Sequence, residues 1–349
     1  MAERFSRSKA RIAVVGCGAV AEILHFPALR RNPGCEVVAL VDKDEARARR
    51  FAAELGTERT FGDYRRLFDL ELDGAIVALP PHIHAPVSAA LLRAGIHVLV
   101  EKPIARTLAE CDEMIAAEAV GGVVLAVGHP RRVAHQCRFA KRVIDAGLLG
   151  TIKSFDVRDG YGFGWPVKTD FPFRKEAAGG GVLIDLGVHA LDLLVWWFGD
   201  LQVLEHRDND QGGVESESLT RFGTEAGLEG VAEFSRTRTL RNTVVVSGDR
   251  AHMEVSLTSN RVTLEHVDGP GVTVDPIQTE GTERWADQTP VDLTLALQVD
   301  WQKAARSGRP PAVTGTEARR SLSLILDSYA GRLPLGVPWI DAVREGVSP

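Results

Sequence analysis

A glycine-rich turn directly after a short apolar run near the start of the chain limits the folds that this sequence can adopt. The run Ile12 to Val15 has the character of a buried strand, and it leads into Gly16-Cys17-Gly18-Ala19-Val20-Ala21. In such a turn the first glycine allows the tight bend, the second lets the backbone approach a pyrophosphate, and a small third residue lets helix and strand pack. The turn therefore predicts a βαβ unit that binds a dinucleotide at Gly16, Gly18, Ala19 and Val20, with helix amides facing the phosphates.

An acidic residue lies where such a unit places one for the ribose. Asp42 ends a second apolar run, Val37 to Val41, and follows Gly18 by 24 residues. A carboxylate at this place binds the ribose hydroxyls and repels a 2′-phosphate, which favours NAD. Lys43 beside it could compensate the negative charge, so the pattern leaves NADP open and makes Lys43 a further candidate at the cofactor.

Apolar runs alternate with helical stretches through the first third of the chain, as in a doubly wound sheet with strands buried on both faces. The rhythm changes after about residue 128, where several strand-like segments follow one another without helices between them. They span residues 152–157, 228–234, 243–247, 252–257 and 261–265. We therefore predict an α/β protein with a Rossmann domain over residues 1–128, followed over residues 129–349 by a domain with an antiparallel or mixed sheet.

Composition excludes several classes of function. The net charge of −6 and a pI near 6.0, without a long basic run, argue against nucleic-acid binding and favour a small-molecule partner. The most apolar window, Val182 to Gly199, contains three ionisable residues that a bilayer would not tolerate, so we expect a buried helix and no membrane partner. Four scattered cysteines predict neither a metal site nor disulfides. The polar first nine residues look like a frayed tail rather than a signal peptide, and we expect a cytoplasmic protein.

The segment Glu101-Lys102-Pro103 follows the apolar run Ile96 to Val100. Open α/β sheets bind their ligands at the carboxyl ends of the strands, which places Lys102 in the expected active site and Glu101 beside the cofactor. Pro80 and His84 follow the preceding strand at the same edge of the sheet. We therefore expect both of them at the cofactor as well.

A second polar cluster lies in the segment Gly179 to His189, which opens with three glycines. If this segment begins a helix, Asp185 and His189 are i,i+4 neighbours on one face. Histidine titrates near neutral pH and burial can tune a lysine, so His189 or Lys102 could exchange a proton with a carbinol while hydride passes to nicotinamide. The candidate catalytic residues are therefore Lys102, Asp185 and His189, while Asp192 could orient the imidazole or point elsewhere.

Aromatic residues crowd a short stretch between the two clusters, at Tyr161, Phe163, Trp165, Phe171 and Phe173. Aromatic faces pack against the C–H face of a sugar or cyclitol ring, so we expect Tyr161 and Trp165 to bind substrate together with Lys102, Asp185 and His189. Nearby cations could hold a phosphate or carboxylate. The alternative is a hydrophobic lid or a subunit contact.

Taken in their order along the chain, these motifs resemble those of the Gfo/Idh/MocA oxidoreductases. The runs 78–84 and 94–103 are similar to the family signature, residues 179–189 are similar to its second-domain motif, and the resemblance covers nearly the whole chain. It implies a Rossmann domain followed by an α/β domain whose large, mostly antiparallel sheet mediates homo-oligomers. It also implies that Lys102 contacts the reacting hydroxyl or carbonyl, that His189 serves as acid or base, that Asp185 assists substrate binding and proton movement, and that the Lys102-Pro103 peptide is cis.

Together, these features predict an NAD(P)-dependent oxidoreductase that interconverts a secondary alcohol and a ketone on a sugar, a cyclitol or a nucleotide-linked sugar. One alternative is a regulatory sensor that binds a dinucleotide without turnover. Another is an enzyme of the same fold that acts on a non-carbohydrate such as a dihydrodiol or an imine. The presence of Lys102, Asp185 and His189 together favours an enzyme over a sensor.

Overall fold

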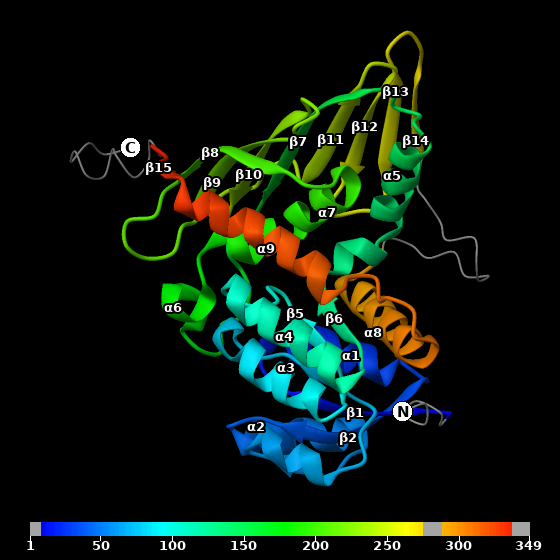
Figure 1. Cartoon of the computed structure of the whole chain (residues 1–349), viewed down its shortest axis with the longest axis vertical. Helices are drawn as coiled ribbons and strands as arrows, with labels where there is room; N and C mark the ends of the chain where they lie inside the picture. Colours follow the sequence, from blue (N-terminus) through cyan, green and yellow to red (C-terminus); the bar gives the residue numbers. More distant parts are fainter. Residues whose placement is uncertain (1–7, 275–287, 337–349) are drawn as a thin grey trace.

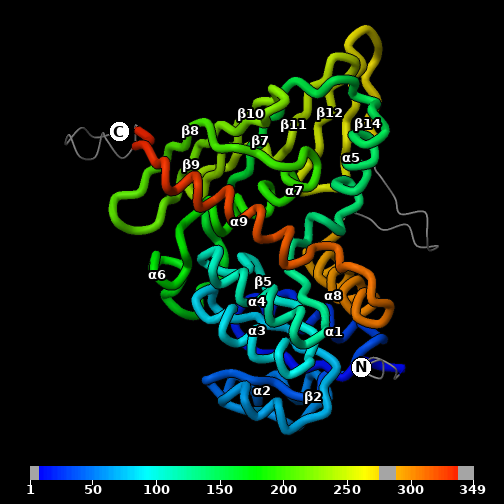
Figure 2. The backbone as a smooth tube through the Cα atoms, viewed as in Figure 1, coloured from blue at the N-terminus to red at the C-terminus, as the bar shows by residue number. Residues whose placement is uncertain are grey.

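Two β-sheets organise the molecule, one in each half of Figure 1. The structure is a computed structural model that describes residues 8–274 and 288–336. Most of the predicted N-terminal tail, residues 1–7, lies outside the described residues. In the backbone trace of Figure 2 the described chain starts in the lower half and ends in the upper half, so the two ends of the fold lie far apart.

The first sheet is entirely parallel and has the strand order β3-β2-β1-β4-β5-β6. Nearly every residue of its central strands is buried, which is why the sequence shows them as continuous apolar runs. Its strands are β1 (Ala10–Val15), β2 (Cys35–Val41), β3 (Thr60–Phe61), β4 (Gly74–Val77), β5 (His97–Glu101) and β6 (Leu125–Gly128). This order confirms the predicted Rossmann fold. The two-residue strand β3 was not predicted.

Side-chain capping boxes begin three of the long helices. Capping boxes form at Thr107 with Glu110, at Thr289 with Asp292 and at Thr314 with Glu317. The α-helices are α1 (Phe26–Arg30), α2 (Glu45–Ala52), α3 (His84–Arg93), α4 (Leu108–Gly121), α5 (His135–Asp145), α6 (Lys175–Ala178), α7 (Val188–Phe198), α8 (Pro290–Ser307) and α9 (Gly315–Ala330). Short 3-10 turns are η2 (Ala53–Leu55), η3 (Tyr64–Asp69), η4 (Pro81–Ile83), η5 (Pro130–Val133) and η6 (Phe171–Phe173), and π-helical turns are η1 (Ala21–His25) and η7 (Leu183–Gly187).

The second sheet is mixed, with the order β14-β13-β12-β11-β7-β10-β9-β8-β15. The pairs β7–β10 and β8–β15 are parallel and the other neighbours antiparallel, in agreement with the predicted mostly antiparallel sheet. Its strands are β7 (Ile152–Gly160), β8 (Gln202–Asp208), β9 (Glu217–Gly223), β10 (Glu229–Ser235), β11 (Thr243–Gly248), β12 (Ala251–Ser256), β13 (Val262–His266), β14 (Gly271–Val274) and β15 (Arg332–Pro334). Strands β8, β9, β14 and β15 were not predicted.

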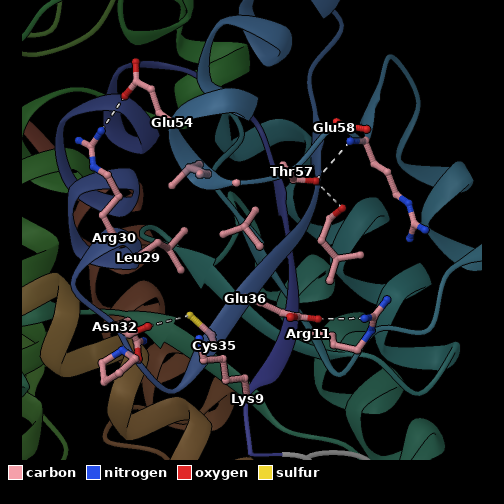
Figure 3. Close-up of a pocket in the computed structure, with 16 residues that line it drawn as sticks. Lys9, Arg11, Leu29, Arg30, Asn32, Cys35, Glu36, Glu54, Thr57 and Glu58 are labelled. Carbon is pink, nitrogen blue, oxygen red and sulfur yellow. Dashed lines mark hydrogen bonds and ion pairs between the residues drawn. The ribbon is translucent and has the colours of Figure 1, made fainter.

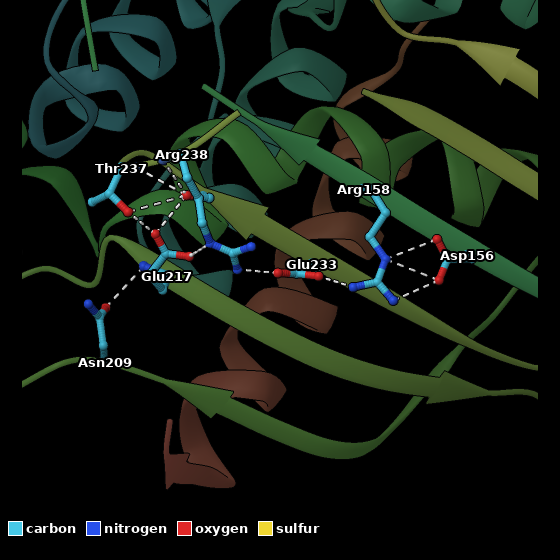
Figure 4. Close-up of polar contacts among 8 residues, drawn as sticks. Asp156, Arg158, Asn209, Glu217, Glu233, Thr237 and Arg238 are labelled. Atoms are coloured by element: carbon cyan, nitrogen blue, oxygen red, sulfur yellow. Dashed lines mark hydrogen bonds and ion pairs between the residues drawn. The ribbon is translucent and has the colours of Figure 1, made fainter. Parts of the chain in front are cut away.

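Side chains on one face of this sheet pack on helices, and those on the other face form a row of ion pairs. Phe155 points to the helical side, where its ring stacks on Phe198 with centroids 5.5 Å apart. On the opposite side, Asp156 bonds Arg158, and Glu233 connects Arg158 with Arg238 (Figure 4). Helix α9 crosses between the two sheets (Figure 1) and contacts both halves of the molecule.

Helix α8 returns to the first sheet although it follows the second one in the chain. Trp301 of α8 is 1% exposed and packs against Gly74 of β4, and the Gln298 amide nitrogen lies 3.4 Å from the His25 carbonyl oxygen. The stretch Lys175–Phe198 is long and apolar enough to cross a membrane by length and composition alone, and 83% of its most apolar window is buried inside the fold. The stretch contains α6, η7 and α7, and nearly all residues of η7 and α7 are buried, which agrees with the buried helix predicted for residues 182–199.

Candidate active site

A cavity of about 490 Å³ lies where the strand ends of both sheets meet. From the first half it is lined by Val20, by Glu101-Lys102-Pro103 at the end of β5 and by Gly128 at the end of β6. From the second half it is lined by the loop after β7, by Asp185 and His189, and by Arg236 directly after β10. The structure thus brings together Val20, Glu101, Lys102, Tyr161, Trp165, Asp185 and His189 of the predicted site.

The glycine turn has the geometry that a dinucleotide needs. Gly16 has a φ of +98°, and a Cβ added there would lie 2.8 Å from the carbonyl carbon of Ala78, at the end of β4, and closer still to its oxygen. A Cβ added at Gly18 would meet nothing within 4 Å, so its backbone faces open space. Ala21 is fully buried in the core. The turn therefore fits the predicted roles, with Gly16 closing the bend and Gly18 leaving room for a phosphate.

Asp42 fastens this turn to the second strand. Its carboxylate accepts the Cys17 amide at 2.8 Å and the Asp44 amide at 2.9 Å. The Arg47 guanidinium lies 3.6 Å away, and Lys43 beside Asp42 is exposed. The Asp42 side chain is 11% exposed, so a carboxylate stands at the edge of the ribose position expected from the fold.

Lys102 is held by a single acidic residue. Its ammonium group donates to the Asp185 carboxylate and to the Asp185 carbonyl oxygen, both at 2.8 Å. The other oxygen of the same carboxylate accepts a hydrogen bond from Arg236, whose guanidinium lies 5.1 Å from the ring centre of Phe163. One carboxylate thus fixes two cations at the wall of the cavity. The Lys102-Pro103 peptide is cis, as the sequence resemblance implies.

Both acid–base candidates, Asp185 and His189, have lowered pKa values. The shift favours the charged form of the carboxyl group and the neutral form of the imidazole. Burial alone would raise the pKa of Asp185, but Lys102 and Arg236 outweigh it and hold that pKa far below its usual range. Burial also lowers the pKa of His189 well below the ordinary value, and the nearby charges of Lys102 and Arg131 lower it further. At neutral pH Asp185 is therefore an anion and His189 a neutral imidazole.

The expected partnership between Asp185 and His189 takes a different form. The segment that carries Asp185 is a π-helical turn, η7, rather than the start of a regular α-helix. The Asp185 carboxylate turns to Lys102 and Arg236, and within the described parts of the chain no hydrogen bond joins it to His189. Asp192 points elsewhere and forms a buried two-hydrogen-bond ion pair with Arg132, at 2.7 and 3.0 Å. The His189 ring instead meets His129 edge to face, with centroids 6.0 Å apart.

The sequence matches agree with this geometry. Residues 10–129 match the oxidoreductase family with an NAD-binding Rossmann fold, and residues 137–254 match the C-terminal domain of the GFO/IDH/MocA proteins. The chain belongs to the Gfo/Idh/MocA oxidoreductase family. It is therefore an oxidoreductase whose first domain binds a nicotinamide dinucleotide, as the glycine turn and Lys102 predict.

Several relatives of this Gfo/Idh/MocA protein are named for sugars or nucleotide-linked sugars, and one, of Comamonas testosteroni, is a 1-carboxy-3-chloro-3,4-dihydroxycyclohexa-1,5-diene dehydrogenase, 32% identical over 53% of this chain and 46% of that relative. It is 38% identical to a putative UDP-kanosamine synthase oxidoreductase subunit of Amycolatopsis mediterranei, over 54% of this chain and 52% of that relative, so the match spans about half of each. It is 29% identical to a dTDP-3,4-didehydro-2,6-dideoxy-alpha-D-glucose 3-reductase of Actinomadura kijaniata, over 90% of this chain and 93% of that one. Among solved structures, levoglucosan dehydrogenase in complex with NADH and levoglucosan superposes with a TM-score of 0.81 at 19% identity, covering 93% of this chain and 97% of that chain.

Two of the expected cofactor residues, His84 and Pro80, do not line the cavity. His84 is fully buried, with its ring nitrogens 2.9 Å from the Pro103 carbonyl oxygen and 2.6 Å from that of Leu79. Its side chain therefore fastens two strand-end loops together and has no surface for a cofactor, which corrects the expectation from sequence. Pro80 precedes the short turn η4, and its neighbours Leu79 and Pro81 line the cavity instead.

Glu101 also has an internal partner, which the sequence did not reveal. The His25 ring nitrogen lies 2.8 Å from one carboxylate oxygen, and the Lys102 amide donates to the other at 3.2 Å. Burial would raise the pKa of Glu101, but His25 and Lys102 lower it. This contact connects the helical turn after the glycine loop with the strand end that carries Lys102.

The aromatic segment forms the outer wall of the cavity. Tyr161 and Trp165 line it and remain 51% and 43% exposed, while Phe163 packs edge to face on Phe173 with ring centroids 5.5 Å apart. Lys168 of the same segment lies 3.2 Å from Glu22, which follows the glycine turn. The aromatic loop thus bridges the two halves of the molecule over the cavity.

Arg236 is the cavity residue that sequence reasoning missed. Strands β7 and β10 run parallel, so the aromatic loop after β7 and Arg236 after β10 emerge at the same edge of the sheet. The sequence predicts a strand over residues 228–234, and a cation just beyond it was the available signal. Its significance depends on the parallel pairing, which the sequence does not show.

A second hollow, of about 710 Å³, lies at the amino ends of β1 and β2, away from the strand ends that carry the site (Figure 3). Two ion pairs lie in its wall, Arg11 with Glu36 and Arg30 with Glu54. Among the described residues no group of three or more histidine, cysteine and acidic side chains is placed to hold a metal ion. The chemistry therefore concentrates in the cavity around Lys102.

Proposed function

We propose that this oxidoreductase interconverts a secondary alcohol and a ketone on a sugar, a cyclitol or a nucleotide-linked sugar. The observation that carries the proposal is the triple contact of Lys102, Asp185 and Arg236 in a cavity walled by Tyr161 and Trp165. The sugar-modifying relatives support the substrate class. When bound, a nicotinamide ring accepts or supplies the hydride.

In the proposed mechanism Lys102 binds the substrate oxygen. An ammonium group placed there stabilises the negative charge that develops on oxygen as a carbinol loses its proton or a carbonyl gains hydride. Asp185 keeps Lys102 in position through two hydrogen bonds. Because its own pKa lies far below neutrality, Asp185 does not carry the proton.

His189 is the proposed proton acceptor in the direction of alcohol oxidation. It is neutral at physiological pH, lines the cavity and therefore has a free lone pair for the carbinol proton. In the reverse direction the imidazolium form returns the proton. Arg131 and Lys102 disfavour that charged form, so the proton is readily released to the substrate.

We propose NAD as the preferred cofactor. The Asp42 carboxylate would repel a 2′-phosphate, while its oxygens can accept the two ribose hydroxyls. Lys43 and Arg47 are the nearby cations that would have to reverse this preference. Comparison of the initial rates with NAD and NADP at equal concentrations tests it, since equal kcat/KM for both would contradict the role of Asp42.

We also propose that the enzyme is a cytoplasmic homo-oligomer assembled through the open face of its second sheet. Val231 of β10 and Val245 of β11 are the cross-strand partners of Asp156, which belongs to the row of ion pairs on that face (Figure 4). All four cysteines are buried and unpaired, which fits a reducing compartment. Sedimentation velocity of the wild type and of Val231→Glu tests the interface, because a monomer in both cases would contradict it.

The decisive experiment follows nicotinamide absorbance with NAD or NADP and a panel of inositols, free sugars and nucleotide sugars. We expect Lys102→Met to lose at least about 1,000-fold in kcat, because the group that stabilises the oxygen charge is gone, while NADH binding persists. Lys141→Met is the matched control, since Lys141 pairs with Asp145 on the surface of α5. Unchanged turnover in Lys102→Met would refute the mechanism, and cofactor binding without turnover of any substrate would favour a sensor.

A further inference from the structure

Arg236 is a buried cation held from two sides. It directly follows β10, and its side chain is 9% exposed. One terminal nitrogen donates to Asp185, and the guanidinium plane lies 5.1 Å from the centre of the Phe163 ring. These contacts fix the orientation of the side chain before any substrate arrives.

Arg236 uses few of its side-chain hydrogen-bond donors within the described residues. A guanidinium carries five N–H donors in a planar fork. Its bond to Asp185 is the only side-chain hydrogen bond that Arg236 makes with the described residues, and the residue lines the cavity. The fork geometry matches the two oxygens of a carboxylate better than it matches single hydroxyls.

Two cations share one carboxylate at the reacting position. Lys102 and Arg236 share the single carboxylate of Asp185, one at each of its oxygens. The nearby Glu101 is already engaged by His25 and by the Lys102 amide. Arg236 therefore shares its only carboxylate partner among the described residues with Lys102, and a ligand carboxylate would give the guanidinium an anionic partner of its own.

The spacing sets the position of that ligand's charge. Because Lys102 and Arg236 contact opposite oxygens of one carboxylate, the two cations lie within the span of a single hexose. A substrate whose reacting oxygen contacts Lys102 can therefore reach Arg236 with a group at another carbon of the same ring. The aromatic side chains Tyr161 and Trp165 would cover the ring between these two contacts.

We propose that Arg236 binds the carboxylate of a sugar acid, so that the substrate is a uronic or aldonic acid rather than a neutral sugar. This inference rests on the proposed function, since it assigns the substrate class to the same site. It makes Arg236 the residue that determines specificity. Lys102 is left to the reacting oxygen.

The test compares acids with their neutral counterparts by isothermal titration calorimetry on the NADH-bound protein. The probes are D-glucuronate against D-glucose, D-galacturonate against D-galactose and D-gluconate against D-sorbitol, with D-glucose 6-phosphate as a second kind of anion. We expect at least one acid to bind at least tenfold more tightly than its neutral counterpart. Arg236→Gln should remove that difference, and Arg236→Lys should keep part of it because the charge remains without the fork.

The control variant is Arg238→Gln, which also removes a positive charge two residues farther along the chain. Arg238 is 42% exposed and pairs with Glu217 and Glu233 on the open face of the sheet (Figure 4), so it should keep the preference for acids. Thermal unfolding of each variant shows that it is folded before titration.

The proposal is overturned if no acid binds more tightly than its neutral counterpart, or if the preference survives in Arg236→Gln. Equal affinity for glucuronate and glucose 6-phosphate would overturn the assignment to a carboxylate and indicate a general anion site. Selective binding of acids through Arg236 without hydride transfer would refute the proposed function alone. Turnover of neutral sugars without any preference for acids would refute this inference alone.

Discussion

Gly16 and Gly18 of the cofactor turn have different roles. Gly16 is needed for the turn to fold, and Gly18 leaves room for the cofactor. Gly16 is in the left-handed region, at a φ of +98°, and a Cβ there would overlap the carbonyl group of Ala78. A left-handed non-glycine residue costs about 1–3 kcal/mol, and forcing a tightly packed turn apart costs about 1–3 kcal/mol more. Gly16→Ala should therefore lower the free energy of unfolding by about 2–6 kcal/mol.

Gly18→Ala is the matched variant, because the same methyl group there meets no protein atom within 4 Å. We expect its free energy of unfolding to stay within about 0.5 kcal/mol of the wild-type value in the absence of cofactor. The methyl group instead occupies the space that the backbone leaves for a phosphate. NADH affinity should fall at least tenfold, which corresponds to about 1.4 kcal/mol.

Urea unfolding with and without NADH measures both effects. At a concentration of 100 times Kd, NADH should stabilise the wild type by about 2.7 kcal/mol. Gly18→Ala should start from the same stability and gain at least about 1.3 kcal/mol less from that concentration of NADH. The separate roles of the two glycines are refuted if Gly16→Ala is as stable as Gly18→Ala without cofactor, or if Gly18→Ala binds NADH as the wild type does.

Two further predictions concern stability. Asp192→Asn should lower the free energy of unfolding by about 3–5 kcal/mol, because it leaves the buried Arg132 without its main counter-charge; Asp200→Asn, at an exposed pair with Arg320, should change it by less than about 1 kcal/mol in the same urea titration. Burial lowers the pKa of three histidines below that of the unfolded chain, so the unfolded state binds more protons below about pH 6.5 and stability should fall as the pH decreases from there, by up to about 1.4 kcal/mol per pH unit for each. These residues are His84, His129 and His189. Urea midpoints at pH 7.5, 6.5 and 5.5 check this, and a stability that rises toward pH 5.5 would contradict it.

The parts of the fold that the sequence predicts are those whose burial is uniform. Strands β1, β2, β4 and β5 are covered on both faces, which produces continuous apolar runs. Strands β8 and β9 alternate between the core and an open face that carries Glu205, Arg207 and Arg221, so they show no continuous apolar run. Strand β3 has only two residues and gives no pattern at all.

The site was predictable where a residue follows a buried parallel strand, as Lys102 does. The i,i+4 spacing predicted that Asp185 and His189 act as a pair, and this prediction failed because the backbone departs from a regular helix. The π-helical turn at Asp185 directs this side chain to Lys102 rather than to His189. It also failed for His84, whose place after a strand suggested the cofactor while the packing of two loops buries it completely. Arg236 required knowledge of which strands pair in parallel.

The return of α8 to the first sheet has a consequence for protein engineering. Consider a chimera in which only residues 1–128 are replaced by those of a relative. Its new β4 would have to pack on Trp301, which fills the space beside Gly74, and the residue at the place of His25 would have to accept the contact with Gln298. The foreign cofactor unit would then meet a helix whose side chains were selected for another surface. Exchange of cofactor specificity by recombination should therefore transfer α8 together with the first sheet, as two crossover segments rather than one.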